Sequence, residues 1–257
     1  MGIADLLAYA ISLRTGRSVD EERARVWLVD SKGLVTAART SEKNFAHHKL
    51  AYAHAAPAGA VDLVSLEGIV RAVRPTALIG VSAQPSTFTK PVVAAMAELN
   101  ARPIIFSLSN PTSKSECTAR EAYEWTGGAA VFASGSPFDA LTITLPSGAQ
   151  RAFSPGQGNN AFIFPAVGLA VLSVRMRVVP AHSLYVAACA LAACVAGTDV
   201  DGARNGNIYP SLSDIRSVSA SIAIAVAEDA YAQGIADLPR PADLAAHIRS
   251  CMWDPRY

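Results

Sequence analysis

Four short apolar runs alternate with helical segments over the first half of the chain, and this alternation constrains the fold more than any other feature. Runs of this length, closed by turn residues, are typical of strands that are buried on both faces of a sheet. The predicted strands are residues 26–29, 76–81, 103–108 and 130–133, and the predicted helices between and after them are residues 63–73, 91–99 and 117–125. The pattern therefore predicts an α/β fold, a doubly wound parallel sheet with helices on both faces.

Polar residues follow three of these runs. Asp30 closes the first run, Ser82 follows the second, and Asn110 comes shortly after the third. In open α/β sheets, ligands bind beyond the carboxyl ends of the strands. These three positions are therefore expected to lie at a ligand site.

The beginning of the chain lacks the usual opening of a dinucleotide-binding unit, which is a strand followed by a G-x-G-x-x-G turn. Here Gly2 opens a helix directly, and Asp30 ends the next strand. The sequence therefore has no residues that could form the first strand or supply the first two glycines. We therefore expect a Rossmann-type sheet that lacks its first strand and its glycine loop.

The pattern changes after residue 140. A hairpin is predicted for residues 141–153, around Pro146, Ser147 and Gly148, and helical segments follow at residues 160–176, 182–196 and 213–233. We expect residues 1–140 to form a partial Rossmann core that binds NAD(P). Residues 141–257, the hairpin and a helical C-terminal extension, are expected to complete the same domain.

Charge and composition narrow the choice of partners. The chain has 22 basic and 21 acidic residues, a net charge of +1, and no dense basic run. This balance argues against nucleic acid or an anionic membrane as a partner, and the longest apolar stretches are too short to span a bilayer. Cys117, Cys189, Cys194 and Cys251 form no C-x-x-C pair, so we expect reduced cysteines that pack as small apolar residues.

Several blocks, in matching order and spacing, resemble the C-terminal domain of malic enzymes. They are GIADLL from Gly2, WLVDSKGL from Trp27, RPTALIGV from Arg74, RPIIFSLSNPTSKSEC from Arg102, FASGSPF from Phe132 and FSPGQGNNAFIFPAVGLA from Phe153, and the likeness extends with gaps to about Tyr231. Malic enzymes oxidise L-malate with NAD or NADP and a divalent metal, Mg²⁺ or Mn²⁺, and decarboxylate the product to pyruvate and CO₂. The resemblance implies L-malate and a nicotinamide nucleotide as ligands, and a homo-oligomer.

The resemblance also implies roles for three asparagines. Asn110 in SLSNPT and Asn160 in PGQGNN match family asparagines near the substrate carboxylate and the nicotinamide, and Asn159 precedes the latter in the same turn. We expect all three to bind substrate, and Asn110 and Asn159 to contact the cofactor as well. An amide donates to a carboxylate and accepts from a carboxamide without adding charge that opposes hydride transfer. In isolation, SNPT also fits an Asx turn, and GQGNN a glycine turn that caps a helix.

Asp30 matches the acidic residue that receives the adenosine ribose hydroxyls, although without the family context an ordinary strand-end carboxylate describes it equally well. Ser31 and Lys32 resemble the NADP-preferring members, in which cationic and hydroxyl groups offset the 2′-phosphate that a bare aspartate would repel. NADP is therefore expected in preference to NAD. Lys43 or a nearby base could assist; otherwise Arg39, Lys43 and Lys49 are interpreted as solvated charges.

Val81 and Ser82 begin a loop that departs from the glycine-rich form common in the family. We still expect both to border the cofactor, although Pro85 removes one N–H donor from this loop. The segment SGSPF, at residues 134–138, also lies near the site in the family, and a structural turn is the better local description of it.

The metal-binding carboxylates, the lysine base and the tyrosine acid of the family all lie upstream of the block that matches Gly2. We therefore predict no catalytic residue and no metal ligand in this chain, and expect it to be inactive alone. The alternative is a non-catalytic nucleotide-binding or oligomerisation module derived from such an enzyme. An amino-acid dehydrogenase fits less well, because SLSNPT and GQGNN occur together. We expect a cytoplasmic protein, with a mitochondrial location left open.

Overall fold

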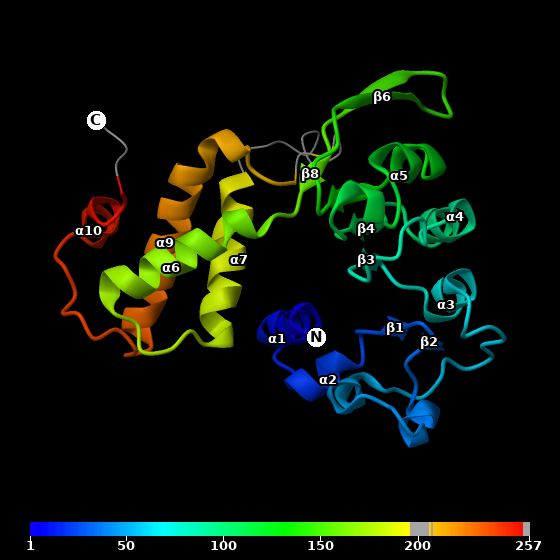
Figure 1. Ribbon diagram of the computed structural model, residues 1–257, viewed down its shortest axis with the longest axis horizontal. Coiled ribbons are helices and arrows are strands. Elements are labelled where there is room, and N and C mark those ends of the chain that lie inside the picture. The colour runs from blue at the N-terminus through cyan, green and yellow to red at the C-terminus, as the bar shows by residue number, and fades with distance from the viewer. Residues whose placement is uncertain (196–205, 207, 254–257) are drawn as a thin grey trace. The chain divides into compact units, whose positions relative to one another are not determined.

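The computed structural model describes residues 1–195, 206 and 208–253. The chain divides into two compact units, Met1–Phe153 and Ser154–Tyr257, which Figure 1 colours from blue to green and from green to red. Each unit has its own hydrophobic core.

Three parallel strands form the centre of the first unit. β3 (Ala77–Gly80), β4 (Ile104–Ser107) and β5 (Val131–Ser134) pair in that order. Their register places Leu78, Ile105 and Phe132 in one row across the sheet. Ile105 and Phe132 are buried in the hydrophobic core, and Leu78 packs against it. The predicted α/β class and these three predicted strands are confirmed.

Three helices contribute to that core, and they lie in a row beside the strands in Figure 1. They are α3 (Leu66–Val73), α4 (Lys90–Leu99) and α5 (Ala119–Trp125). Each begins where the sequence provides a helix start. The Ser65 hydroxyl accepts from the Gly68 N–H at α3, Pro91 lies in the first turn of α4, and Thr118 and Glu121 form a capping box at α5.

The first elements of the chain are two helices and a short hairpin. α1 (Gly2–Thr15) ends at Gly16, whose φ of 74° is the left-handed conformation that glycine adopts readily, and α2 (Val19–Arg23) follows. The helix that opens at Gly2 was predicted. β1 (Val29–Asp30) and β2 (Gly33–Leu34) form an antiparallel pair, and η1 (Ala37–Ser41) and η2 (His47–Tyr52) are 3₁₀ turns in the long connection that comes next.

The prediction of a buried parallel strand at residues 26–29 is wrong. Val29 is exposed, and the chain turns back immediately after Asp30 to pair with itself. The turn is stabilised locally, because the Asp30 carboxylate accepts a hydrogen bond from the Lys32 N–H at 2.9 Å and Gly33 adopts a φ of 105°. An aspartate that bonds the backbone two residues ahead favours a turn over a continuing strand.

The predicted hairpin at residues 141–153 is present as β6 (Leu141–Thr144) and β7 (Gln150–Phe153). Its apolar side chains Ile143 and Phe153 lie in the core of the first unit, where Phe153 stacks on Tyr123 with ring centroids 4.0 Å apart. The hairpin is therefore packed as part of the first unit, and the chain divides after Phe153.

The second unit is mainly helical. It contains β8 (Gly156–Gln157), η4 (Asn160–Phe162), α6 (Phe164–Val174), α7 (Ala181–Val195), η5 (Leu212–Asp214), α9 (Ile215–Ala232) and α10 (Leu244–Ser250). Helix α9 packs against both α6 and α7, and its buried alanines, which include Ala223 and Ala227, allow a close approach. The three predicted helical segments are confirmed, except that Ala196, the predicted end of the second, lies outside the described residues. The α10 helix was not predicted.

All four cysteines are free, but they do not share one environment. Cys117 is buried, as expected, and burial raises the pKa of its thiol to about 12. Cys189 and Cys251 are exposed, so the expectation of packed, apolar cysteines is wrong for these two. Both lie on or next to helices of the second unit.

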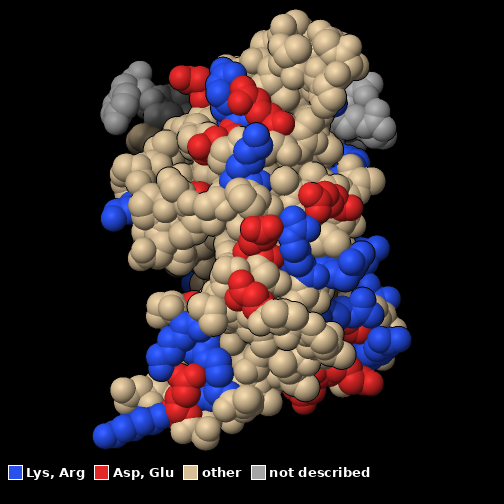
Figure 2. All heavy atoms as spheres, turned by 90° about the vertical axis from the view of Figure 1, so that its right-hand side faces the viewer, with Lys and Arg blue, Asp and Glu red and all other residues tan. Residues whose placement is uncertain are grey.

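No helix in the described parts of the chain is long and apolar enough to cross a membrane. Figure 2 shows basic and acidic side chains interspersed over one face of the molecule rather than separated into broad patches of one sign.

Candidate functional site

Asp30 lies at the centre of five charged side chains around the β1–β2 hairpin, which we call the hairpin cluster: Asp30, Lys32, Arg39, Glu42 and Lys49. Lys49 Nζ lies 2.5 Å from Asp30 Oδ2, and Arg39 Nη2 lies 3.0 Å from Asp30 Oδ1. Lys32 Nζ lies 2.6 Å from Glu42 Oε2. Three cations thus accompany two carboxylates, and the cluster carries a net charge of +1.

Arg39 organises this cluster. Its Nε donates to Glu42 at 2.7 Å, and its Nη1 donates to the main-chain carbonyls of Gly33 and Leu34 at 3.1 and 3.0 Å. The side chain is only 15% exposed, and that of Lys49 only 25%. The interpretation of Arg39 and Lys49 as solvated charges is therefore wrong: both hold the Asp30 carboxylate.

The environment of Asp30 favours its charged form. Partial burial acts to raise the pKa, but the hydrogen bonds from Lys49, the Lys32 N–H and Arg39 prevail and hold the pKa of Asp30 below its ordinary value. Ser31 is exposed next to it, and its hydroxyl makes no hydrogen bond with the described residues. Lys32 is also exposed. The hairpin therefore presents the Ser31 hydroxyl and the Lys32 ammonium group to solvent beside a neutralised carboxylate.

The second candidate region lies at the carboxyl ends of β3 and β4, where Ser82 and Asn110 were predicted to lie. Val81 is 61% exposed, and the following residues through Ser86 are exposed as well. Ala83 and Ser86 have φ angles of 55° and 57°. These left-handed conformations suit glycine, so the loop keeps a backbone shape that a glycine-rich loop would adopt more easily.

Asn110 is exposed and its amide is oriented by a neighbouring loop. The Ser136 hydroxyl donates to Asn110 Oδ1 at 2.5 Å, and the Asn110 Nδ2 lies against Gly135, 3.0 Å from where a Cβ of that residue would be. Gly135 allows this approach, because a Cβ at that position would lie 2.2 Å from the Leu108 carbonyl oxygen. The SGSPF turn therefore has a role beyond turning the chain: it orients a predicted site residue.

Beneath the two strand ends lies Glu116, which is fully buried. Its carboxylate accepts hydrogen bonds from the Ser107 hydroxyl at 3.0 Å and the Ser109 hydroxyl at 2.5 Å. Sequence reasoning missed Glu116, because a glutamate between Ser115 and Cys117 has no feature that separates it from an exposed one. Arg39 and Lys49 had a weak signal, since they are cations in the loop that follows Asp30.

Asn159 and Asn160 lie in the second unit, at the start of η4. Asn159 Oδ1 accepts a hydrogen bond from the Ala161 N–H at 2.9 Å, so this side chain caps the turn, and Asn160 is exposed. The Asn159 side-chain carbonyl therefore behaves as in the alternative prediction for GQGNN, a turn that caps a helix.

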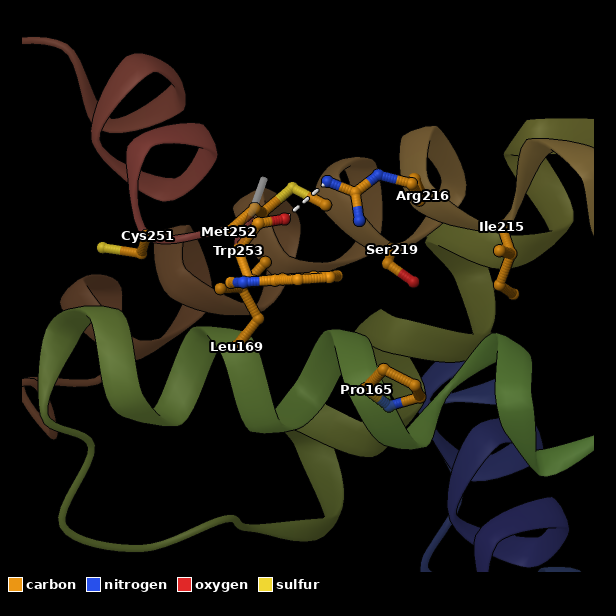
Figure 3. Close-up of a pocket in the computed structure, with 8 residues that line it drawn as sticks. All are labelled: Pro165, Leu169, Ile215, Arg216, Ser219, Cys251, Met252 and Trp253. Atoms are coloured by element: carbon orange, nitrogen blue, oxygen red, sulfur yellow. Dashed lines mark hydrogen bonds between the residues drawn. The ribbon is translucent and has the colours of Figure 1, made fainter. Parts of the chain in front are cut away.

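The second unit also contains an apolar pocket of about 290 Å³, shown in Figure 3. It lies between α6, α9 and the chain that follows α10, and none of the predicted site residues lines it. The Arg216 guanidinium, at its edge, donates to the Trp253 carbonyl at 2.8 Å. In the described portion of the molecule, no group of three or more His, Cys, Asp or Glu side chains is placed to hold a metal ion.

Solved structures share this fold. An Entamoeba histolytica malic enzyme aligns with 97% of the chain at a TM-score of 0.65 and 19% identity, over 53% of its own length. A malic enzyme from Pyrococcus horikoshii aligns with 72% of the chain at a TM-score of 0.55 and 24% identity, over 36% of its length. These likenesses confirm the predicted Rossmann-type α/β fold.

Sequence comparison gives the family. The NADP-dependent malic enzyme 3 of Arabidopsis thaliana is 45% identical over the whole chain, and the chloroplastic NADP-dependent malic enzyme of Zea mays is 43% identical. The chain spans 41% and 38% of these relatives, respectively. The family model described as "Malic enzyme, NAD binding domain" matches residues 1–231. The chain therefore belongs to the malic enzyme NAD-binding domain family.

Proposed function

We propose that this chain binds a nicotinamide dinucleotide, NADP in preference to NAD, within a protein that oxidatively decarboxylates L-malate to pyruvate and CO₂. The observation that carries the nucleotide preference is the pair of cations on Asp30. A bare aspartate would repel a 2′-phosphate, whereas Arg39 and Lys49 offset its charge. The exposed Ser31 hydroxyl and Lys32 ammonium can then donate to the phosphate oxygens.

The proposal assigns the nicotinamide end of the nucleotide to the strand-end region. Val81 and Ser82 would border the cofactor, and Asn110 would donate its amide to the carboxamide or to the substrate carboxylate. Asn159 and Asn160 would contact the substrate, and Asn159 also the cofactor. Support for these roles comes from the SLSNPT and PGQGNN motifs, and for Asn110 also from the orientation that Ser136 imposes.

Other parts of the enzyme would supply the acid, the base and the Mg²⁺ or Mn²⁺ ligands. In this proposal residues 1–140 form the nucleotide-binding core, residues 141–257 complete the domain, and the full enzyme is a cytoplasmic homo-oligomer. A non-catalytic nucleotide-binding or oligomerisation module is the less favoured alternative, because relatives that are 45% and 44% identical over the whole chain are named as NADP-dependent malic enzymes.

Titration of the purified chain with NADPH and with NADH, followed by the fluorescence of the reduced nicotinamide, tests the nucleotide preference. We expect tighter binding of NADPH. Lys49→Gln should weaken NADPH binding about tenfold and leave NADH binding within about twofold, because one charge-assisted contact to the Asp30–phosphate region is lost. Equal affinities in the wild type would disprove the preference, and no binding of either nucleotide would disprove the proposal.

Arg102→Gln is the control, since Arg102 is an exposed cation of the same unit that precedes β4, at the end of the sheet opposite Ser82 and Asn110. It should leave both affinities unchanged. The same preparation, assayed with L-malate, Mn²⁺ and NADP⁺, should show no turnover. Malate-dependent turnover would show that the acid, base and metal ligands are present in this chain.

A further inference from the structure

The Glu116 carboxylate is fully buried, yet no Lys, Arg or His of the described ranges forms an ion pair with it. Burial of a carboxylate is costly unless hydrogen bonds satisfy its oxygens. The donors here are hydroxyl and main-chain N–H groups from the ends of two strands. Besides the Ser107 and Ser109 hydroxyls, the Ser82 N–H lies 3.4 Å from Oε1 and the Ser109 N–H 3.5 Å from Oε2.

Ser109 extends this network to the exposed loop after β3. Its hydroxyl donates to Glu116 Oε1 and accepts from the Ala83 N–H at 2.9 Å. The N–H groups of Ser82 and Ala83 are therefore both fixed by Glu116, one directly and one through Ser109. Ala83 is one of the two residues in this loop with a left-handed backbone, a conformation that persists only where the surroundings enforce it.

The main chain next to Glu116 holds the other end of the same loop. The Ser86 N–H donates to the Ser115 carbonyl at 3.1 Å, and the Phe88 N–H donates to the Glu116 carbonyl at 3.0 Å. The segment Ser115–Glu116 thus fixes both ends of the loop at residues 82–88.

Gly80, the last residue of β3, is shaped for this arrangement. A Cβ at that position would lie 2.4 Å from Glu116 Cδ and 2.6 Å from its Cγ. Only a glycine lets the buried glutamate lie across the end of the strand.

We propose that Glu116 is a positioning residue that fixes the loop after β3, and with it Val81 and Ser82, in the geometry that receives the nicotinamide half of the dinucleotide. This inference rests on the proposed function. The carboxylate suits the role because it only accepts hydrogen bonds, and each of its oxygens faces a main-chain N–H. A glutamine in either orientation of its amide would direct an NH₂ group at one of these donors.

The test compares Glu116→Gln with the wild-type chain in two measurements. The first is amide hydrogen exchange of Ser82 and Ala83 by NMR, which needs no ligand. The second is the affinity for NADPH and for adenosine 2′,5′-bisphosphate, which lacks the nicotinamide half. We expect exchange at the two amides to increase about tenfold and NADPH binding to weaken about tenfold, as for the loss of one hydrogen bond to a charged group. Binding of the bisphosphate should stay within about twofold.

Two further variants support the comparison. Ser109→Ala removes only the bridge to Ala83 and should increase exchange at Ala83 more than at Ser82, which keeps the proposal testable if Glu116→Gln does not fold. Glu124→Gln alters an exposed glutamate of α5 that pairs with Arg120, and it should change neither measurement.

The outcomes separate the two proposals. Unchanged exchange at Ser82 and Ala83 would overturn the positioning role, whatever the nucleotide does. Faster exchange with unchanged NADPH affinity, or with equal weakening of both ligands, would overturn the link to the nicotinamide half. If exchange is faster in the variant but the wild-type chain binds neither ligand, the proposed function is overturned. The result would still show that Glu116 fixes the loop.

Discussion

The Asp30 carboxylate is held by two cations and is 20% exposed, whereas the Glu116 carboxylate is fully buried and held by hydroxyl and main-chain N–H groups. Both carboxylates lie in the first unit. Asp30 closes a two-residue strand and folds the chain back. Glu116 lies under the ends of β3 and β4, in the space that Gly80 leaves open.

The difference indicates two distinct uses of a carboxylate. Two largely buried cations neutralise Asp30. The exposed Ser31 hydroxyl and Lys32 ammonium leave donors beside it for a second anion. Uncharged donors surround the buried Glu116 carboxylate, and their hydrogen bonds to it fix the backbone around it. The first arrangement suits recognition of a ligand charge, and the second suits shaping of a loop.

The largest expected effect is the loss of Arg39. Arg39→Ala leaves Asp30, Glu42 and two main-chain carbonyls with fewer partners in a region that is largely shielded from water. We expect the free energy of unfolding to fall by about 3 kcal/mol, measured by urea unfolding followed with tryptophan fluorescence. Arg71→Ala, which removes exposed pairs with Glu67 and Glu98, should leave the free energy of unfolding nearly unchanged. Similar losses in both variants would contradict the organising role of Arg39.

Gly80→Ala tests the Glu116 region by steric displacement. The added methyl would meet Cγ and Cδ of the Glu116 side chain, which is fully buried. We expect a loss of about 2 kcal/mol in the free energy of unfolding. Gly168→Ala in α6, where a Cβ would meet nothing within 4 Å, should instead be neutral or stabilise by up to about 1 kcal/mol. A neutral Gly80→Ala would show that Glu116 is free to move.

The sequence pattern predicted the parallel strands, the helices that cover them and the 141–153 hairpin. Hydrophobic periodicity shows which side of an element is buried, and turn residues show where the element ends. It failed at residues 26–29. An apolar run is compatible with a central strand or with a short hairpin, and the partner is chosen by the turn that Asp30 and Gly33 make.

The same limit applies to the site. The strand-end positions of Ser82 and Asn110 follow from where strands stop, so sequence reasoning found them. The burial of Arg39, Lys49 and Glu116 depends on segments that are distant along the chain; Asp30 and Lys49, for example, are 19 positions apart. No local pattern of charge distinguishes these side chains from solvated ones.

Acid titration should separate the hairpin cluster from an ordinary surface carboxylate. The pKa of folded Asp30 lies below its ordinary value of 3.8, so its charged form stabilises the fold above about pH 4, and that contribution is lost as the pH falls through the folded pKa. Asp30→Asn should lower stability by about 1–2 kcal/mol at pH 7 and reduce the loss of stability on acidification. Asp139→Asn, at an exposed aspartate, should do neither. An Asp30→Asn variant that kept the full acid dependence would assign that dependence to other carboxylates.

The smallest expected effect is a difference in salt sensitivity between the two regions. Lys49→Gln and Ser109→Ala should each cost about 1 kcal/mol in the free energy of unfolding at low ionic strength. The Debye length falls from about 10 Å at 0.1 M salt to about 3 Å at 1 M, and Lys49 is a quarter exposed. Urea unfolding in 1 M NaCl should therefore reduce the cost of Lys49→Gln and leave that of Ser109→Ala unchanged, since Ser109 contributes a buried hydroxyl rather than a charge. If salt reduces the cost of both substitutions equally, the Glu116 carboxylate is accessible to ions. The contrast between the hairpin cluster and the buried Glu116 carboxylate would then no longer hold.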